Sequence, residues 1–408
     1  MPVEPTPVRR KILFFAEAVT LAHISRPIVL AGGLDPSRYE VVLATASRYP
    51  SLWRDLPIRV RSIDSITGAQ FLDALAGGRP LYDAATLRRY VENDLSVIRE
   101  VEPDVIVGDF RLSLSVSARV ARVPYLAVTN AYWSPYARQR FPLPELPMVK
   151  WLGVRVSQAL FNLARPLAFA LHTRPLNRVR REHGLPPLGF DLRRVYTDAD
   201  QTLYADVPEL VPTFDLPDHH HYLGPILWSP SVEPPPWWGE VGTDRPIVYV
   251  TMGSSGPVAL LSGVLDALSD LPVLVIAATL GQSLPRPTPP NALTADYLPG
   301  LVATARARLV VCNGGSPTTH QALASGVPVL GIAGNMDQHL NMAGIVRMGA
   351  GELLRTDAAS PPSIRAAASR LLDAPGYTAS ARSLAAVFSG YDAPARFRAV
   401  VDGYPARR

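Results

Sequence analysis

The segment 309–319 carries the clearest chemistry in the sequence. An apolar run leads into Gly314 and Gly315, and we expect Ser316 to be the N-cap of a helix whose first residue is Pro317. The two glycines let a ligand approach the backbone closely. The free N–H groups and the dipole of a helix N-terminus then favour an anion. The segment therefore predicts a phosphate-binding loop.

A carboxylate and an amide follow the next apolar run. Residues 327–332 are typical of a buried strand, and the loop after it carries Asp337 and Gln338. Open α/β sheets bind ligands at the carboxyl ends of their parallel strands. We therefore expect this pair to lie beside the phosphate loop, where it can bind hydroxyl groups. The alternative is an ordinary solvated turn.

A family resemblance lies in the stretch that begins at Asn313 and reads NGGSPTTHQALASGVPVLGIAGNMDQHLNM. It resembles the donor-binding signature of nucleotide-sugar-dependent glycosyltransferases with the GT-B fold. Within them it is most similar to the large family that glycosylates small lipophilic acceptors such as antibiotics, plant phenolics and steroids. The resemblance covers nearly the whole chain, strongly in the C-terminal half and weakly between about residues 138 and 190.

This resemblance implies an inverting, metal-independent hexosyltransferase. Its donor would be a UDP- or dTDP-sugar, a substrate that makes a separate cofactor unnecessary. Its acceptor would be a lipophilic alcohol or phenol bound near Phe110 and the apolar stretch 132–188. Three alternatives stay open: a transferase that acts on a lipid at a membrane face, a sugar-nucleotide epimerase, and a catalytically silent partner that activates another transferase.

A histidine and an aspartate follow two predicted strands of the N-terminal half. His23 comes after the strand at 11–15, and Asp109 ends the strand that begins at Asp104. The resemblance implies that His23 is the general base and that Asp109 orients it. Histidine suits this role because its ordinary pKa is ~6.5, and an Asp–His pair fixes the tautomer. The alternatives are a packed histidine and an aspartate that caps a helix.

The resemblance also implies how the donor is held. It assigns the nucleobase to Tyr297 and Leu298, the ribose to Gln321, and the sugar hydroxyls to Asp337 and Gln338. The diphosphate would be bound by Gly253, Ser254, Asn313, Gly315, Ser316 and Thr318. The alternative for Tyr297 is ordinary core packing.

Asn313 departs from the family pattern, which has histidine at this point. An asparagine amide donates hydrogen bonds but never carries a positive charge. Pro317 also removes an amide that the phosphate would otherwise meet. Weaker donor affinity, an unusual donor or a lost activity would each follow from this change.

Strands that alternate with helices are needed to position these groups. The pattern predicts two Rossmann-like domains with parallel sheets, which the GT-B resemblance places on either side of a cleft. We expect an acceptor domain at 1–223, a proline-rich linker at 224–246, and a donor domain at 247–381. The tail 382–408 would be a helix, with its helical pattern at 382–401, that packs back on the first domain, as the resemblance implies.

Composition excludes several classes of protein. The chain has 408 residues, enough for two domains, and its net charge of +5 comes from scattered basic residues, which argues against nucleic-acid binding. Cys312 is the only cysteine, so no intrachain disulfide forms, and we expect a buried small side chain in a cytoplasmic protein. Because neighbouring side chains diverge, the histidines at 219–221 predict a solvated loop rather than a metal site.

The segment 151–172 is the most apolar candidate for membrane contact. Arg155, Gln158, Asn162 and Arg165 would all lie inside the bilayer, so we reject a membrane-spanning helix. A helix that lines an apolar pocket, or a patch at the inner membrane face, stays open. The sequence does not indicate an oligomeric state.

Overall fold

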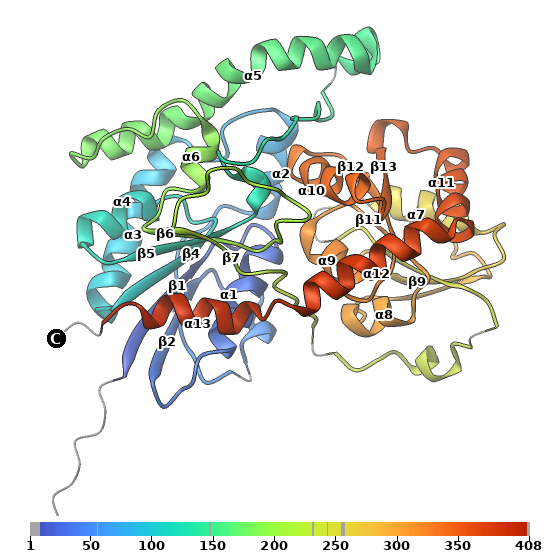
Figure 1. Ribbon diagram of the computed structural model, residues 1–408, viewed down its shortest axis with the longest axis horizontal. Coiled ribbons are helices and arrows are strands. Elements are labelled where there is room, and N and C mark those ends of the chain that lie inside the picture. The colour runs from blue at the N-terminus through green and yellow to red at the C-terminus, as the bar shows by residue number, and fades with distance from the viewer. Residues whose placement is uncertain are drawn as a thin grey trace, which may run out of the picture. The chain divides into compact units, whose positions relative to one another are not determined.

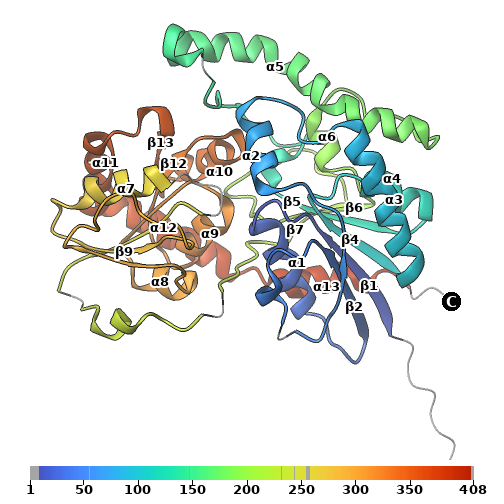
Figure 2. The ribbon, with the colours of Figure 1, turned by 180° about the vertical axis from the view of Figure 1, so that it is seen from behind.

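Each half of the chain folds around a parallel β-sheet with helices on both faces (Figures 1 and 2). The computed structural model describes residues 9–54, 56–146, 148–230, 232–242, 244–253 and 258–405. Within them the first sheet has the strand order β3-β2-β1-β4-β5-β6-β7 and the second β10-β9-β8-β11-β12-β13. The predicted α/β class with two Rossmann-like halves is confirmed.

The first unit contains the strands β1 (Arg10–Ala16), β2 (Tyr39–Thr45), β3 (Arg59–Ser62), β4 (Val105–Asp109), β5 (Tyr125–Thr129), β6 (Gln201–Tyr204) and β7 (His220–Tyr222). Its helices are α1 (Ala22–Gly32), α2 (Gly68–Ala76), α3 (Ala84–Val101), α4 (Leu114–Ala121), α6 (Leu192–Tyr196) and α13 (Ala393–Asp402), with short 3₁₀ turns at Pro50–Leu52 and Ala131–Trp133.

The second unit contains β8 (Ile247–Thr251), β9 (Leu274–Ala278), β10 (Ala292–Ala295), β11 (Leu309–Cys312), β12 (Val329–Ala333) and β13 (Gly351–Arg355). Its helices are α7 (Val258–Leu268), α8 (Gly300–Arg306), α9 (Ser316–Ala324), α10 (Met336–Arg347), α11 (Pro361–Asp373) and α12 (Pro375–Ser389), with 3₁₀ turns at Pro236–Glu240 and Thr356–Ala358.

Strand β1 illustrates why the sequence forms buried parallel strands. Ile12 and Phe14 pack in the core that α1 and α13 cover, whereas Leu13 and Phe15 pack in the core under α3 and α4. Because side chains alternate between faces and both faces are covered, a central strand must be apolar throughout. This places the strand ends, and the polar residues that follow them, at one edge of the sheet.

Contacts divide the chain differently from the predicted domain limits. One unit comprises Met1–Arg138, Asn162–Ile226 and Tyr391–Arg408, and the other comprises Gln139–Phe161 and Leu227–Gly390. The prediction assigned 139–161 to the first domain. The residues of α5 (Val149–Glu182) are therefore shared between the units, and Gly153 interrupts its helical geometry with φ +71°.

The C-terminal tail forms two helices where the sequence pattern predicted one helix over 382–401. α12 ends at Ser389, and Asp392 caps α13 by accepting a hydrogen bond from Ala395 N at 2.9 Å. Pro394 stands in the first turn of α13, where its missing N–H costs nothing. Phe397 of α13 then packs in the core of the first unit, with its ring 5.7 Å from that of Phe14.

His220 and His221 belong to an edge strand and His219 directly precedes it, so the prediction of a solvated loop is wrong for His220. β7 pairs with β6, and His220 is buried with Nδ1 2.7 Å from Tyr204 Oη. His219 remains exposed, because successive strand residues point to opposite faces. No group of three metal-ligating side chains occurs among the residues that the structure describes.

His220 should make part of the protein's stability sensitive to acid. Burial, reinforced by His219 and His221, lowers the pKa of His220 to about 4. The unfolded chain takes up this proton near pH ~6.5, so the free energy of unfolding should fall by roughly 3 kcal/mol between about pH 6.5 and 4. His220→Gln should flatten this dependence in urea titrations, and His219→Gln should flatten it much less, because burial is the main cause of the lowered pKa. An unchanged slope in His220→Gln would contradict the assignment.

Candidate functional site

His23 and Asp109 lie in direct contact at the carboxyl ends of two neighbouring strands. Asp109 is the last residue of β4, and His23 stands in the first turn of α1. His23 Nδ1 lies 2.7 Å from Asp109 Oδ1. The aspartate is buried, whereas the histidine side chain is 17% exposed. One edge of the imidazole therefore faces the carboxylate while the ring stays accessible.

Arg26 completes this group, and the sequence analysis missed it. Its Nε and Nη2 atoms each donate to a carboxylate oxygen of Asp109 at 2.7 Å, and Nη2 also lies 3.0 Å from His23 Nδ1. Its Nη1 donates to Asn130 Oδ1 at 2.8 Å. The signal was available, because residues three apart share a helix face and Arg26 follows His23 by three.

Phe110 covers one face of the His23 ring. Its ring stacks on His23 with 4.5 Å between centroids and 11° between planes. Phe110 adopts φ +58°, a left-handed conformation that is unfavourable for a bulky residue and persists only when its surroundings impose it. This backbone geometry turns the ring toward His23.

Aromatic side chains surround Phe110. Rings within 6.4 Å of it are those of Phe71, Tyr82 and Tyr196, and Trp133 packs edge-on against Tyr196. A small cavity adjoins this group, with a largely apolar lining that includes Tyr82, Leu112, His172, Leu176 and Tyr196. The side chains are of the kind that contact hydrophobic or aromatic ligands, but the cavity itself, about 20 Å³, has room for little more than one water molecule.

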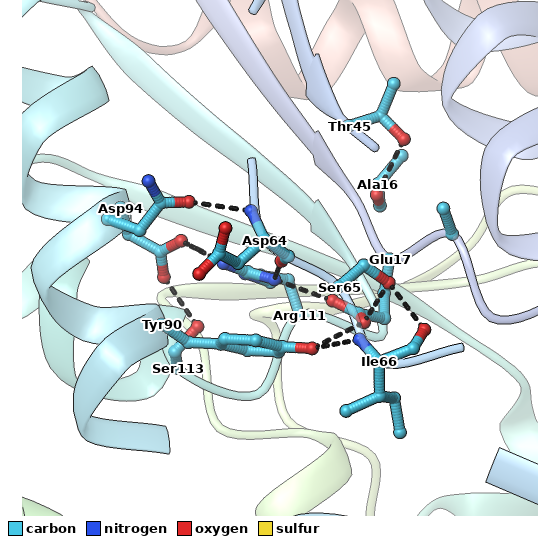
Figure 3. Close-up of polar contacts among 12 residues, drawn as sticks. Ala16, Glu17, Thr45, Asp64, Ser65, Ile66, Tyr90, Asp94, Arg111 and Ser113 are labelled. Carbon is cyan, nitrogen blue, oxygen red and sulfur yellow. Dashed lines mark hydrogen bonds and ion pairs between the residues drawn. The ribbon is translucent and has the colours of Figure 1, made fainter. Parts of the chain in front are cut away.

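A buried network of charges is built around Arg111, the residue after Phe110 (Figure 3). Arg111 Nη1 donates to Glu17 Oε2 at 2.8 Å, and Arg111 Nε donates to Asp94 Oδ1 at 3.0 Å. Its guanidinium lies 3.7 Å from the ring centre of Tyr90, whose hydroxyl donates to Glu17. Burial opposes the charge of Arg111, but Asp94 and Glu17 outweigh it and hold the pKa of Arg111 above its ordinary value.

This network ties together the segment that leads to His23 and the segment that follows Asp109. Glu17 follows β1 on the path to His23, and its backbone N–H donates to Asp109 O at 3.2 Å. Arg111 follows Phe110 directly and also donates to Asp64 O at 2.6 Å. Because both flanks of Phe110 are tied to buried partners, the network accounts for its left-handed backbone.

The predicted phosphate loop joins β11 to α9 in the second unit. α9 begins at Ser316, and its N-cap is Gly315 rather than Ser316 as predicted. The reason is that Asn313 Oδ1 accepts a hydrogen bond from Gly315 N at 3.1 Å and holds the turn itself. Gly314 has φ +80°, which favours glycine.

Asn341 supports this loop from α10 and was not identified from the sequence. Its Nδ2 donates to Gly314 O at 2.8 Å and to Thr319 Oγ1 at 2.9 Å. Thr318 lies half-buried in the first turn of α9. Gly253, at the end of β8, has φ +61°, and a Cβ there would lie 3.1 Å from Asn313 Nδ2. Ser254 lies outside the described residues.

Tyr297 and Leu298 differ in exposure. Tyr297 is 50% exposed, which excludes the core-packing alternative, whereas Leu298 is buried. Gln321 is buried in α9, where its Nε2 donates to the carbonyl of Trp228.

Asp337 and Gln338 lie in the first turn of α10 rather than in a solvated turn. Gln338 forms a capping box with Asn335, in which its Oε1 accepts from Asn335 N at 3.3 Å; the same oxygen also accepts from Gly334 N at 2.9 Å. Asp337 is exposed beside it. Because the Gln338 oxygen is engaged, its Nε2 is the atom that suits a ligand hydroxyl.

Cys312 is buried at the end of β11, as expected of a small core side chain. Burial raises the pKa of its thiol to about 12, although the N–H of Gly314 donates to the sulfur at 3.3 Å and opposes this rise. The neutral thiol is a poor nucleophile.

Known glycosyltransferases are similar to this chain. Residues 262–397 match the family described as Erythromycin biosynthesis protein CIII-like, C-terminal domain. The chain is 55% identical over 385 residues to a PGL/p-HBAD biosynthesis glycosyltransferase of Mycobacterium tuberculosis, covering 94% of this chain and 90% of that protein. A PGL/p-HBAD biosynthesis rhamnosyltransferase of Mycobacterium bovis is 56% identical over 380 residues, with 93% and 84% covered.

A shorter match, 56% identical over 265 residues, is an M. bovis protein named as an inactive PGL/p-HBAD biosynthesis glycosyltransferase; it covers 65% of this chain and 72% of that protein. Among solved structures, the spinosyn rhamnosyltransferase SpnG has the same fold, with a TM-score of 0.71 at 19% identity over 96% of this chain and all of that one. SpnG has been solved with thymidine diphosphate and with spinosyn aglycone.

Proposed function

Because the chain belongs to the GT-B glycosyltransferases and is similar over most of its length to the PGL/p-HBAD enzymes, we propose that it transfers a hexose with inversion from a UDP- or dTDP-sugar to a lipophilic hydroxyl compound. The observation that carries this proposal is the 2.7 Å contact between His23 and Asp109 beside a cluster of aromatic side chains. The acceptor would bind the first unit and the donor the second.

His23 is the proposed general base. Asp109 can only accept, so we assign the Nδ1 proton of His23 to the bond with Asp109, which leaves the lone pair on Nε2. Nε2 would take the proton of the acceptor hydroxyl as its oxygen attacks the anomeric carbon. The bond from that carbon to the phosphate oxygen breaks, and the nucleoside diphosphate departs with the electron pair. Arg26 and Asp109 would hold the imidazole in place.

The N-terminus of α9 is the proposed site of the leaving diphosphate. Backbone N–H groups near Gly315 and Ser316, with Thr318 and the helix dipole, favour negative charge there without a metal. Asn313 replaces the family histidine and adds no charge, so we expect donor affinity to depend largely on the nucleobase and the sugar. Tyr297 and Leu298 would contact the base, Gln321 the ribose, and Asp337 and Gln338 the sugar.

A donor panel tests this proposal directly. Because the M. bovis relative is named a rhamnosyltransferase, dTDP-rhamnose is the first donor to try, beside UDP- and dTDP-glucose, with a simple phenol as acceptor. We expect one donor to raise the melting temperature and to yield a glycoside of inverted anomeric configuration by NMR. A donor that stabilises the protein but is never transferred would instead support the silent-partner alternative.

Tyr297→Ala should weaken nucleotide binding. The exposed ring can stack on a base, and base–aromatic stacking is worth about 1–3 kcal/mol, or roughly 5–150-fold in Kd. Tyr297→Phe keeps the ring and should bind nearly as well as the wild type. Calorimetric titration of UDP and dTDP measures both variants. Equal affinity in all three proteins would place the base elsewhere.

A further inference from the structure

One face of α5 carries a row of exposed apolar side chains. Val156, Leu160, Leu163, Leu167 and Leu171 follow one another at intervals of four, three, four and four residues. That spacing places them along a single helix face. Leu163 is 82% exposed and Leu167 63%. We call these five residues the α5 stripe (α5 is green in Figure 1).

The charges on α5 are almost all positive. Beyond Leu171 the same face continues with Arg174, Arg178 and Arg181, all exposed, and Lys150 and Arg155 lie toward the other end of the helix. The only acidic residue of α5 is its last, Glu182, which lies 3.2 Å from Arg178. An apolar row between basic groups is the pattern of helices that lie in the interface of an anionic bilayer.

The opposite face of α5 belongs to the candidate acceptor pocket. His172, Pro175 and Leu176 line the cavity beside Phe110, and Leu176 and Val179 are buried. The stripe is therefore not needed to complete the core of the first unit. No helix of the described residues is long and apolar enough to cross a membrane. The helix is thus suited to lie on a bilayer rather than to span it.

We propose that the α5 stripe docks this protein on the surface of an anionic lipid bilayer. The leucines enter the acyl boundary, and the arginines and Lys150 contact lipid phosphates. Resting on the proposed function, this arrangement would let a lipophilic acceptor pass from the bilayer to the pocket on the other face of α5. The source of the acceptor is then the membrane itself.

A second copy of the chain is the less favourable occupant. In a two-fold symmetric dimer the same patch meets itself. Both ends of α5 carry positive charge, so pairing two stripes brings like charges together in either direction. Anionic headgroups neutralise the same charges, which is why we infer a membrane.

Vesicle binding of the full chain tests the proposal. The protein should sediment with vesicles of phosphatidylcholine that contain phosphatidylglycerol as roughly a third of the lipid, and should release them at high salt. Leu163→Gln with Leu167→Gln should weaken partitioning at least about tenfold. Arg174→Gln with Arg181→Gln should weaken it by roughly 25-fold, about fivefold for each charge.

Matched controls separate docking from general surface effects. Val346→Gln alters an exposed apolar residue of α10, and Arg99→Gln with Arg245→Gln removes the same charge elsewhere; both should partition as the wild type does. Wild-type protein that stays in the supernatant, or stripe variants that bind equally well, would overturn the inference. So would a dimer in equilibrium sedimentation that the leucine variants convert to monomer.

Activity toward a water-soluble phenol distinguishes this inference from the proposed function. Without vesicles the stripe variants should transfer sugar as the wild type does, since Leu163 and Leu167 face away from the pocket. If the proteins bound vesicles but none transferred sugar, the proposed function would be wrong and the docking inference would stand. If they transferred sugar but did not bind vesicles, the docking inference would be wrong and the proposed function would stand.

Discussion

Replacing His23 by alanine is expected to lower the rate of glycosyl transfer about 10²–10⁴-fold, the usual cost of losing a general base. Donor binding and the melting temperature should change little. The reason is that Arg26 still pairs with Asp109 through two hydrogen bonds of 2.7 Å, and His23 belongs to the first unit rather than to the donor loops. Steady-state rates and calorimetric titration of the nucleotide measure the two effects separately.

His183→Ala is the matched control, because this histidine is exposed and bonds only locally to Val179 O at 3.0 Å. It should be as active as the wild type. If His23→Ala retained activity within a few-fold of the wild type, His23 would not be the base, and its contact with Asp109 would be structural.

Removing the charge of Arg111 is expected to lower the free energy of unfolding more than removing any other charge discussed above. Arg111→Met leaves Glu17 and Asp94 buried without their counter-ion, and breaking a buried pair in this way typically costs about 3–5 kcal/mol. Because the chain folds as two compact units, exchange of the amide hydrogens of β1 and β4 measures the loss in the first unit directly.

Arg88→Met provides the comparison, since Arg88 pairs with Glu182 at 2.8 Å on the surface, where solvent screens the pair and its loss should change stability little. The loss of stability in Arg111→Lys should lie between those of Arg111→Met and Arg88→Met, because an ammonium keeps the charge but cannot donate as a guanidinium does to two carboxylates. Equal loss in Arg111→Met and Arg88→Met would show that the buried network does not stabilise the loops around Phe110.

The sequence alone determined the α/β architecture and the glycine turn that leads into α9. Runs such as Ile12–Phe15 and Leu309–Cys312 are apolar throughout, and only strands covered on both faces need that pattern. The glycines around Asn313 and the proline after them mark a turn and a helix start through local backbone chemistry. Such patterns depend only on residues that are neighbours in the chain, so they can be recognised without knowledge of tertiary contacts.

Tertiary structure decided which polar groups meet. Arg26 reaches Asp109 across 83 residues, and Arg111 joins Glu17 across 94, so neither partner is marked by local spacing. His220 is buried because β7 adds to the sheet edge, and Asn313 rather than Ser316 holds the turn before α9 because its side chain folds back on Gly315. These contacts are stabilised by burial and by partners that are distant in sequence. Neither can be read from the residues that neighbour each group in the chain.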